Sequence, residues 1–315
     1  MTRAFLFPGQ GSQAVGMGKA LADAFIPARE VFQEVDDALS QKLSALMWEG
    51  PESDLTLTEN AQPAIMAFSI AVIRVLQKEA GMDIARHARL VAGHSLGEYS
   101  ALSAAGAFSL ADTARLLKTR GQAMQAAVPV GEGAMTALIG ADIEVAEAVA
   151  KEAAGDDVCV VANDNAPGQV VLSGAKVAID RVPDIAKAKG VKRAIPLSVS
   201  APFHCPLMQP AADAMAEALA KVNMRPLAVP VLANVTAQEA SDPETVRRLL
   251  VEQVTNRVRW RESMLALKGL GVDTSVEMGG NKVLTGMMRR IDKDIQAIGL
   301  DTPAEIEAFA KAYDV

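Results

Sequence analysis

Short apolar runs and helix-spaced apolar residues alternate along the chain, and this pattern predicts an α/β protein. Helical spacing fills most of the chain between the first glycine-rich loop and about residue 75. A further helix is expected to begin near Leu110, with Ser109 as its N-cap. The strands expected on either side of these helices lie at residues 4–7, 90–92, 229–235 and 275–278.

The pattern changes at about Val128 and then describes a compact unit. It predicts a strand, a helix, two strands, a helix and a strand at residues 135–139, 143–154, 158–162, 169–173, 177–189 and 193–197. A turn-rich segment, residues 163–168, is expected to join the two middle strands. The order βαββαβ is that of a ferredoxin-like fold. The sequence therefore predicts a ferredoxin-like subdomain at residues 128–198, inserted into a discontinuous large domain of residues 1–127 and 199–315.

Composition narrows the class of protein without deciding its function. Half of the 315 residues are hydrophobic and 22% are charged, which suits a globular protein with a sizeable core. A net charge of −7 gives no reason to expect binding to nucleic acid or to an anionic membrane. The longest apolar stretch, residues 64–73, is shorter than the ~20 residues that cross a bilayer. Two distant cysteines, Cys159 and Cys205, suggest neither a disulfide framework nor a metal site, so we expect a soluble cytoplasmic protein.

Residues 93–97, Gly-His-Ser-Leu-Gly, fit the G-x-S-x-G pattern of a nucleophile elbow. The pattern stands where its chemistry requires, after a predicted strand and before a predicted helix. In such a turn the flanking glycines permit a sharp bend, and the serine Oγ is lifted to a helix N-terminus. Ser95 is therefore the candidate nucleophile, and the backbone N–H of Leu96 is a candidate donor to an oxyanion.

A serine nucleophile needs a base, and the chain has only three histidines. His94 adjoins Ser95 on the turn and is expected to point elsewhere, in a packing or hydrogen-bonding role, while His87 is expected at the surface. His204 is the candidate general base, against the alternative of a buried structural histidine. Its neighbour Cys205 is interpreted as a packing residue. The sequence leaves open whether a carboxylate or a backbone carbonyl orients the imidazole.

Two further polar features are candidates for contact with a substrate. The loop at residues 9–13, Gly-Gln-Gly-Ser-Gln, lacks the spacing of a phosphate-binding loop, but it would bring Gln10 to an acyl oxygen from across the site. Arg120 lies beside the apolar stripe of the helix that begins at Leu110. Such an arginine usually extends into solvent. If the substrate carries a carboxylate, Arg120 is the candidate for a clamp of two hydrogen bonds.

Together these motifs resemble the malonyl-CoA:acyl carrier protein transacylases of fatty acid synthesis. The similar segments follow the family's order along nearly the whole chain, and they are Phe-Pro-Gly-Gln-Gly-Ser-Gln (7–13), Gly-His-Ser-Leu-Gly-Glu-Tyr (93–99), Thr-Arg-Gly (119–121), Pro-Phe-His (202–204), Val-Glu-Gln (251–253) and Lys-Val-Leu-Thr-Gly (282–286). The resemblance implies an α/β-hydrolase-like large domain with a ferredoxin-like insertion. One departure is visible, because Gly279-Gly280-Asn281 stands where the family usually has glycine-proline-glycine. This departure leaves the conformation of the loop open.

The resemblance also implies roles in catalysis. Ser95 would be acylated, with His204 as its base and later its acid. Gln10 and the Leu96 amide would form the oxyanion hole, and the backbone carbonyl of Gln253 would orient His204. The implied reaction is ping-pong: a malonyl group passes from malonyl-CoA, the donor substrate, to the serine and then to the phosphopantetheine thiol of acyl carrier protein. No permanently bound cofactor and no metal are expected.

Substrate choice and partners follow from the same resemblance. Arg120 would bind the malonyl carboxylate, and Phe203 would crowd the pocket against a methyl-branched acyl group. The partner would be an acidic acyl carrier protein, the enzyme would be a monomer, and the candidate docking residues are Lys187, Lys189, Lys192, Arg193, Arg257, Arg259, Arg289 and Arg290. The alternatives are a serine thioesterase or esterase, a non-catalytic carrier-binding subunit, a transferase of neutral or branched acyl groups, and an acyltransferase of polyketide synthesis.

Overall fold

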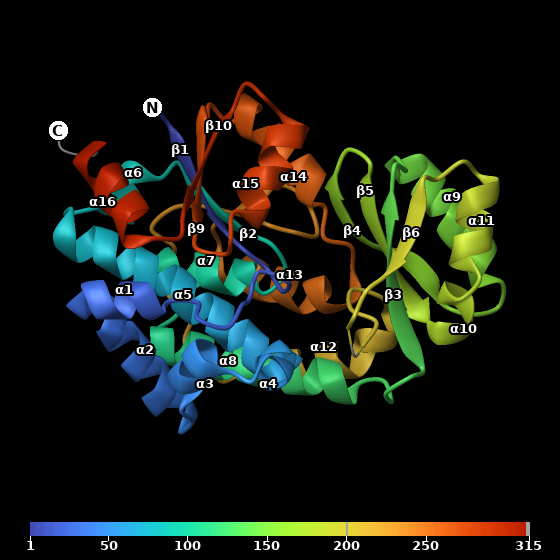
Figure 1. The fold of residues 1–315 in the computed structure, drawn as a ribbon, viewed down its shortest axis with the longest axis horizontal. Coiled ribbons are helices and arrows are strands. Elements are labelled where there is room, and N and C mark those ends of the chain that lie inside the picture. The colour runs from blue at the N-terminus through green and yellow to red at the C-terminus, as the bar shows by residue number, and fades with distance from the viewer. Residues whose placement is uncertain (200, 313–315) are drawn as a thin grey trace.

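Two β-sheets organise the chain, as the computed structural model in Figure 1 shows. The structure describes residues 1–199 and 201–312, so the last residues of the predicted large domain, 313–315, and residue 200 lie outside the described residues. The larger sheet has the strand order β10-β9-β1-β2-β7-β8 and the smaller sheet the order β4-β5-β3-β6. Among the described residues, no helix combines the length and the apolar character needed to cross a membrane.

The larger sheet is parallel except for its last strand. Its strands are β1 (Arg3–Phe7), β2 (Leu90–Gly93), β7 (Val231–Leu232), β8 (Glu239–Ala240), β9 (Thr274–Met278) and β10 (Gln296–Leu300). Only β8 runs antiparallel to its neighbour. Phe7 at the end of β1 is paired with Gly93 at the end of β2. Because the strands are parallel, the glycine-rich loop after β1 and the turn after β2 leave the same edge of the sheet.

Both faces of this sheet are covered by helices. Ala4 and Leu6 pack on one face with residues of α14 and α15, whereas Phe5 and Phe7 pack on the other face with residues of α2, α5, α7 and α8. A strand buried on both faces needs apolar residues at every position, which explains the uninterrupted run of apolar residues at the N-terminus.

The helices outside the smaller sheet are α1 (Lys19–Ala24), α2 (Ile26–Leu39), α3 (Leu43–Glu49), α4 (Glu52–Thr56), α5 (Thr58–Glu79), α6 (Ile84–His87), α7 (Gly97–Ala104), α8 (Leu110–Ala126), the 3₁₀ helix η1 (Pro206–Met208), α12 (Gln209–Ala220), α13 (Pro243–Thr255), α14 (Trp260–Gly269), α15 (Val283–Ile291) and α16 (Pro303–Ala312).

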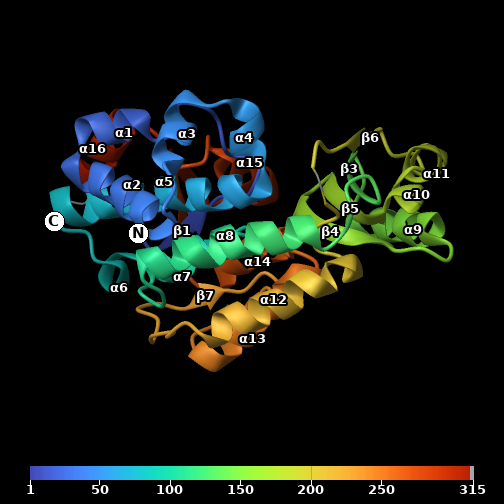
Figure 2. The same cartoon turned by 90° about the horizontal axis from the view of Figure 1, so that it is seen from below.

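Helix α8 carries Arg120 and leads from the larger sheet to the smaller one (Figure 2). Its N-cap is Ser109, whose Oγ accepts a hydrogen bond from the backbone N–H of Asp112 over 3.0 Å. The predicted cap is thereby confirmed.

The smaller sheet is antiparallel and has the predicted order of elements. Its elements are β3 (Gly133–Ile139), α9 (Ile143–Ala154), β4 (Cys159–Ala166), β5 (Gln169–Ala175), α10 (Lys176–Ile179), α11 (Val182–Ala188) and β6 (Arg193–Pro196). The three helices lie on its outer side in Figure 1. The order of elements with this strand order is ferredoxin-like, as predicted from the sequence. The division of the chain into a unit at residues 128–198 and a unit made of the remaining residues stays a prediction.

Three predicted elements differ from the observed ones by more than one or two residues at an end. The helix expected at residues 177–189 is two helices, because Pro183 has no N–H to continue the first and instead stands in the first turn of α11. Strand β7 has two residues instead of seven, since the proline before it cannot donate a ladder hydrogen bond and the chain turns away after it. Strand β4 continues to Ala166 through the expected turn, because the polar residues there are buried against the rest of the protein.

Candidate active site

Ser95 lies in the sharp turn between β2 and α7, and its φ of 53° is in the left-handed region. The turn depends on its two glycines. A Cβ at Gly93 would lie 1.9 Å from the carbonyl carbon of Gly97, and a Cβ at Gly97 would lie 2.2 Å from the carbonyl oxygen of Phe7. The backbone N–H of Ser95 donates to Oδ1 of Asn234 over 2.8 Å. Close packing and this hydrogen bond together hold a backbone conformation that a non-glycine residue seldom adopts.

His204 is hydrogen-bonded to Ser95. Its Nε2 lies 2.8 Å from Ser95 Oγ, and its Nδ1 lies 2.8 Å from the backbone carbonyl oxygen of Gln253. The carbonyl can only accept, so Nδ1 carries the proton and Nε2 is free to accept from the serine hydroxyl. Burial, together with the nearby charge of Arg120, lowers the pKa of His204 to about 3. The imidazole is therefore neutral at neutral pH and able to take a proton.

Arg120 is buried, with 1% of its surface exposed, and does not extend into solvent. Its Nη1 donates to Oε1 of Gln62 over 2.8 Å. Its Nη2 donates to Oε1 of Gln253 over 2.8 Å and to Ser95 Oγ over 3.1 Å. No ion pair joins Arg120 to a carboxylate anywhere in the described residues. A guanidinium held by neutral amides thus lies beside the serine hydroxyl.

These side chains face a cavity of about 310 Å³. Six of the seven residues predicted from the sequence line it, namely Gln10, Ser95, Leu96, Arg120, Phe203 and His204. The seventh, Gln253, is fully buried and contacts the site through its backbone carbonyl and its side chain. Met135 and Asn163 of the smaller sheet, together with residues of helices and loops, complete the lining. The structure therefore brings all seven residues into one place.

Comparison with known proteins identifies the family to which this arrangement belongs. Residues 4–298 match the acyl transferase domain family. This chain belongs to the acyl transferase family. A malonyl CoA-acyl carrier protein transacylase of Bacillus subtilis (strain 168) is 44% identical over 305 residues, covering 96% of this chain and 95% of that protein. The resemblance seen in the sequence is confirmed, and the protein is an acyltransferase.

Solved structures of the family have the same fold. An acyl-carrier-protein-S-malonyltransferase from Bartonella henselae is 56% identical and superposes with a TM-score of 0.97 over 100% of both chains. A malonyl-transacylase in complex with a type II PKS acyl-carrier protein is 41% identical, with a TM-score of 0.95 over 99% of this chain and 100% of that chain. The α/β fold class predicted for the chain is thereby confirmed.

The loop that departs from the family's glycine-proline-glycine pattern has a defined conformation. Gly279, Gly280, Asn281 and Lys282 all have positive φ, at 77°, 89°, 57° and 58°. Proline is fixed near −65°, so it could not replace Gly280 in this conformation. The side-chain amide of Asn281 donates to the carbonyl oxygen of Ser12 over 2.9 Å. The departure thus joins this loop to the glycine-rich loop that carries Gln10.

Strand β4 of the smaller sheet reaches the site through residues that were expected to form a turn. His94 Nε2 lies 2.8 Å from Oδ1 of Asn165, so His94 has the hydrogen-bonding role predicted for it. The buried carboxylate of Asp164 forms an ion pair with Arg261 at 2.9 Å, and its backbone N–H donates to Val258. These contacts fix the smaller sheet against the nucleophile turn.

No role was predicted from the sequence for three residues that support the site. Glu98 is buried, and its Oε2 accepts from Nε2 of Gln253 over 2.8 Å and from the backbone N–H of Asn234 over 3.3 Å. Burial raises the pKa of Glu98 to about 7. Gln62 and Asn234 hold Arg120 and Ser95 as described above. A carboxylate among the apolar residues after the elbow could have indicated that Glu98 is buried beside the site. Nothing in the local sequence pattern indicated a role for Gln62 or Asn234.

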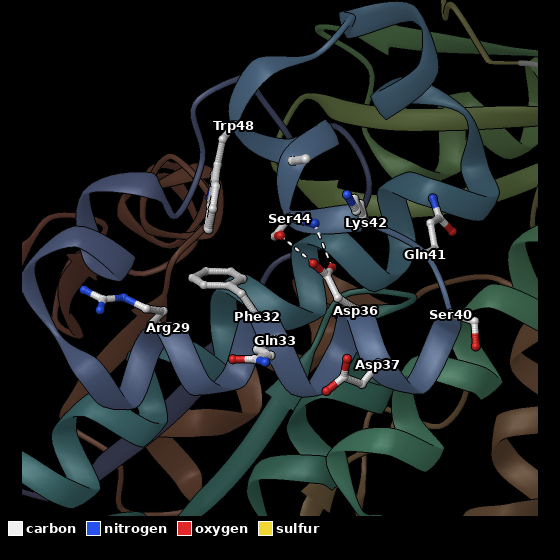
Figure 3. Close-up of a pocket in the computed structure, with 11 residues that line it drawn as sticks. Arg29, Phe32, Gln33, Asp36, Asp37, Ser40, Gln41, Lys42, Ser44 and Trp48 are labelled. Carbon is white, nitrogen blue, oxygen red and sulfur yellow. Dashed lines mark hydrogen bonds between the residues drawn. The ribbon is translucent and has the colours of Figure 1, made fainter.

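A second hollow, of about 690 Å³, lies between α2 and α3 (Figure 3). Phe32 and Trp48 meet there edge to face, with ring centroids 5.8 Å apart. Asp36 accepts hydrogen bonds from both the backbone N–H and the Oγ of Ser44. Asp36 of α2 and Ser44 of α3 therefore join the two helices at this hollow, and the seven predicted site residues all lie elsewhere.

Proposed function

We propose that the protein transfers a malonyl group from malonyl-CoA to the phosphopantetheine thiol of acyl carrier protein through a malonyl-Ser95 intermediate. One observation carries the proposal: Ser95 Oγ is hydrogen-bonded to His204 Nε2 at 2.8 Å and to Arg120 Nη2 at 3.1 Å. A hydroxyl between a neutral base and a buried cation suits an acyl thioester whose acyl group bears a carboxylate.

In the first half-reaction, His204 takes the proton of Ser95 Oγ while that oxygen attacks the thioester carbonyl carbon. The negative charge moves to the carbonyl oxygen, which the backbone N–H of Leu96 and Gln10 stabilise. The carbon–sulfur bond then breaks, and the coenzyme A sulfur leaves as a thiol with the proton from His204. During these steps the carbonyl of Gln253 holds the imidazolium through its Nδ1–H.

In the second half-reaction, the thiol of the carrier protein gives its proton to His204 and attacks the malonyl ester of Ser95. The ester carbon–oxygen bond breaks, and the serine oxygen recovers the proton from the histidine. One thioester replaces another, so the overall reaction is nearly balanced in free energy. Ser95 is thereby a free hydroxyl again and His204 a neutral imidazole.

Arg120 selects the acyl group. Its guanidinium binds the malonyl carboxylate with two hydrogen bonds, for which a planar fork is better suited than an ammonium group. Phe203 lines the same cavity and limits the space for a branch on the acyl chain. A neutral acyl group leaves the buried cation without an anionic partner, which disfavours binding of that group.

The names of the relatives support the proposed acceptor and the proposed pathway. The names of the curated relatives include acyl carrier protein, and one solved relative is in complex with a type II PKS acyl-carrier protein. We propose fatty acid synthesis as the pathway, with polyketide synthesis as the alternative. Every group in the proposed mechanism comes from this one chain, which supports action as a monomer. Two free cysteines suit the cytoplasm that the sequence predicts.

The docking surface proposed from the sequence contains two kinds of cation. Lys187, Lys192, Arg193, Arg289 and Arg290 are exposed and form no ion pair among the described residues, although Arg290 donates to the side-chain oxygen of Gln169. By contrast, Lys189, Arg257 and Arg259 form ion pairs with Glu152, Glu147 and Glu262. We propose that the cations without an ion pair contribute more to binding of an acidic carrier protein, since the charges of the paired ones are already partly neutralised.

The choice of acceptor tests this function against a thioesterase. The purified protein is incubated with malonyl-CoA and either holo acyl carrier protein, apo carrier protein without the thiol, or water alone. We expect malonyl-carrier protein only with the holo form and little free malonate in the other two reactions. Release of malonate at the same rate in all three would instead establish a hydrolase.

A further inference from the structure

Two buried ionisable side chains near Ser95 are connected through a single amide. Nε2 of Gln253 donates to Oε2 of Glu98 over 2.8 Å, and Oε1 of the same amide accepts from Nη2 of Arg120 over 2.8 Å. The exposed fractions of Gln253, Glu98 and Arg120 are 0%, 1% and 1%. The side chain of Gln253 therefore separates a carboxylate from a guanidinium that has no direct acidic partner among the described residues.

The partners of this amide permit only one orientation. A guanidinium can donate hydrogen bonds but cannot accept them, and a backbone carbonyl oxygen such as that of Ser95 can accept but cannot donate. A flipped Gln253 would direct its NH₂ at Arg120 and its oxygen at Glu98, which would break both hydrogen bonds. The NH₂ group also donates to the carbonyl oxygen of Ser95 over 2.9 Å in the observed orientation. Arg120, the carbonyl oxygen of Ser95 and Glu98 together fix which end of the amide faces the arginine.

We propose that Glu98 and the side chain of Gln253 are positioning residues that determine selectivity for an anionic acyl group. They hold the Arg120 guanidinium beside Ser95 with a neutral oxygen and leave its charge available to a substrate carboxylate. A direct carboxylate partner would hold the guanidinium as firmly but would compete with the substrate. This inference rests on the proposed function, and it assigns a role to the Gln253 side chain separate from that of its backbone carbonyl.

The substitution Gln253→Glu tests the inference because it changes the side chain and keeps the carbonyl that holds His204. The new carboxylate would pair with Arg120, and Glu98 would keep a proton and donate it to residue 253. We expect the ratio of kcat/KM for malonyl-CoA to that for acetyl-CoA to fall by about tenfold to a hundredfold, mainly through a higher KM for malonyl-CoA. The matched control is Gln122→Glu, which adds the same charge at an exposed position of α8, and its ratio should equal that of the wild type.

Two substitutions at Glu98 separate positioning from space filling. Glu98→Gln can keep an oxygen toward Nε2 of Gln253, so we expect it to retain most of the malonyl preference. Glu98→Leu fills similar space without an acceptor, and we expect it to lower the ratio. A merely structural role predicts the reverse ranking or no difference. Reaction with a serine-directed phosphonate and the unfolding midpoint show whether each variant is folded with a reactive Ser95.

The outcomes distinguish this inference from the proposed function. If wild-type protein forms no malonyl-Ser95, the proposed function fails before any variant is compared. If the wild type is acylated and the folded Gln253→Glu variant keeps the wild-type ratio, the function stands and the positioning role is overturned.

Discussion

Oγ of Ser95 and Nε2 of His204 lie 2.8 Å apart, although the residues are separated by 109 positions in the chain. Both residues have φ in the left-handed region, at 53° and 56°. Non-glycine residues adopt this conformation only where the surrounding structure enforces it, and such residues concentrate at functional sites. The nucleophile turn and the loop before η1 therefore hold the pair in hydrogen-bonding geometry before any substrate binds.

The low pKa of His204 predicts an unusual pH profile. Burial and the charge of Arg120 lower this pKa to about 3, so the imidazole stays neutral well below the ordinary histidine range. We expect the rate at which a neutral serine-directed phosphonate labels Ser95 to remain constant between about pH 8 and about pH 5. A loss of labelling with a midpoint near the usual histidine pKa of about 6.5 would contradict the assignment.

Substitution of Arg120 by lysine tests whether the side chain recognises the acyl group through its positive charge alone or also through the planar geometry of the guanidinium. Arg120→Lys keeps the positive charge but loses the planar fork that can grip a carboxylate with two bonds. We expect kcat/KM for malonyl-CoA to fall by about a hundredfold, with a smaller effect on acetyl-CoA. Steady-state kinetics with both donors provide the check. An equal loss for both donors would mean that Arg120 supports Ser95 without recognising the acyl carboxylate.

The nucleophile turn should not tolerate a methyl group at Gly97. A Cβ there would lie 2.2 Å from the carbonyl oxygen of Phe7 and 2.7 Å from that of Pro8, and these backbone atoms cannot move aside as a flexible side chain could. We expect Gly97→Ala to lower the free energy of unfolding by about 3 kcal/mol, measured by urea denaturation. The matched control is Gly286→Ala in α15, where no atom lies within 4 Å of the new Cβ apart from the chain neighbours and the backbone of the helix itself. That change should be neutral or stabilising by up to about 1 kcal/mol, and equal losses in both variants would refute the steric account.

The raised pKa of Glu98 predicts a stability difference that depends on pH. The folded protein binds the proton of Glu98 more tightly than the unfolded chain does. The contribution of Glu98 to the free energy of unfolding is therefore complete below pH 4.5 and is lost as the pH rises through about 7. Glu98→Gln removes the titration. Between about pH 5 and about pH 8 we expect the wild type to lose free energy of unfolding that the variant keeps. The difference, variant minus wild type, should therefore increase by up to about 3 kcal/mol over this range. A difference that stays constant across this range would show that Glu98 titrates normally.

Local pattern was sufficient to predict most of the fold and the candidate residues. The apolar runs at residues 4–7 and 90–92 and the order of elements after Val128 predicted the two-sheet architecture. Because histidines are scarce, His204 was left as the candidate base, and the glycines around Ser95 indicated the turn. These features are local, because a strand period, a turn or a rare residue type is visible within a few positions.

The rest of the site depends on contacts between distant segments. Burial of Arg120 requires Gln62 and Gln253, which lie 58 and 133 positions away. The polar residues 163–165 are typical of a turn. In the structure they belong to strand β4, because Asn165 is hydrogen-bonded to His94 and Asp164 forms an ion pair with Arg261. Buried polar residues are stable only when such partners exist, and the sequence does not state which residues those partners will be.

Formation of the malonyl-serine ester tests the central claim most directly. The pure protein is incubated with radiolabelled malonyl-CoA in the absence of carrier protein, and the labelled peptide is identified. We expect one label on Ser95, none on Ser95→Ala, less on Arg120→Ala, and discharge of the label by holo acyl carrier protein. A wild-type protein that acquires no label, or that releases only free malonate, would contradict the account.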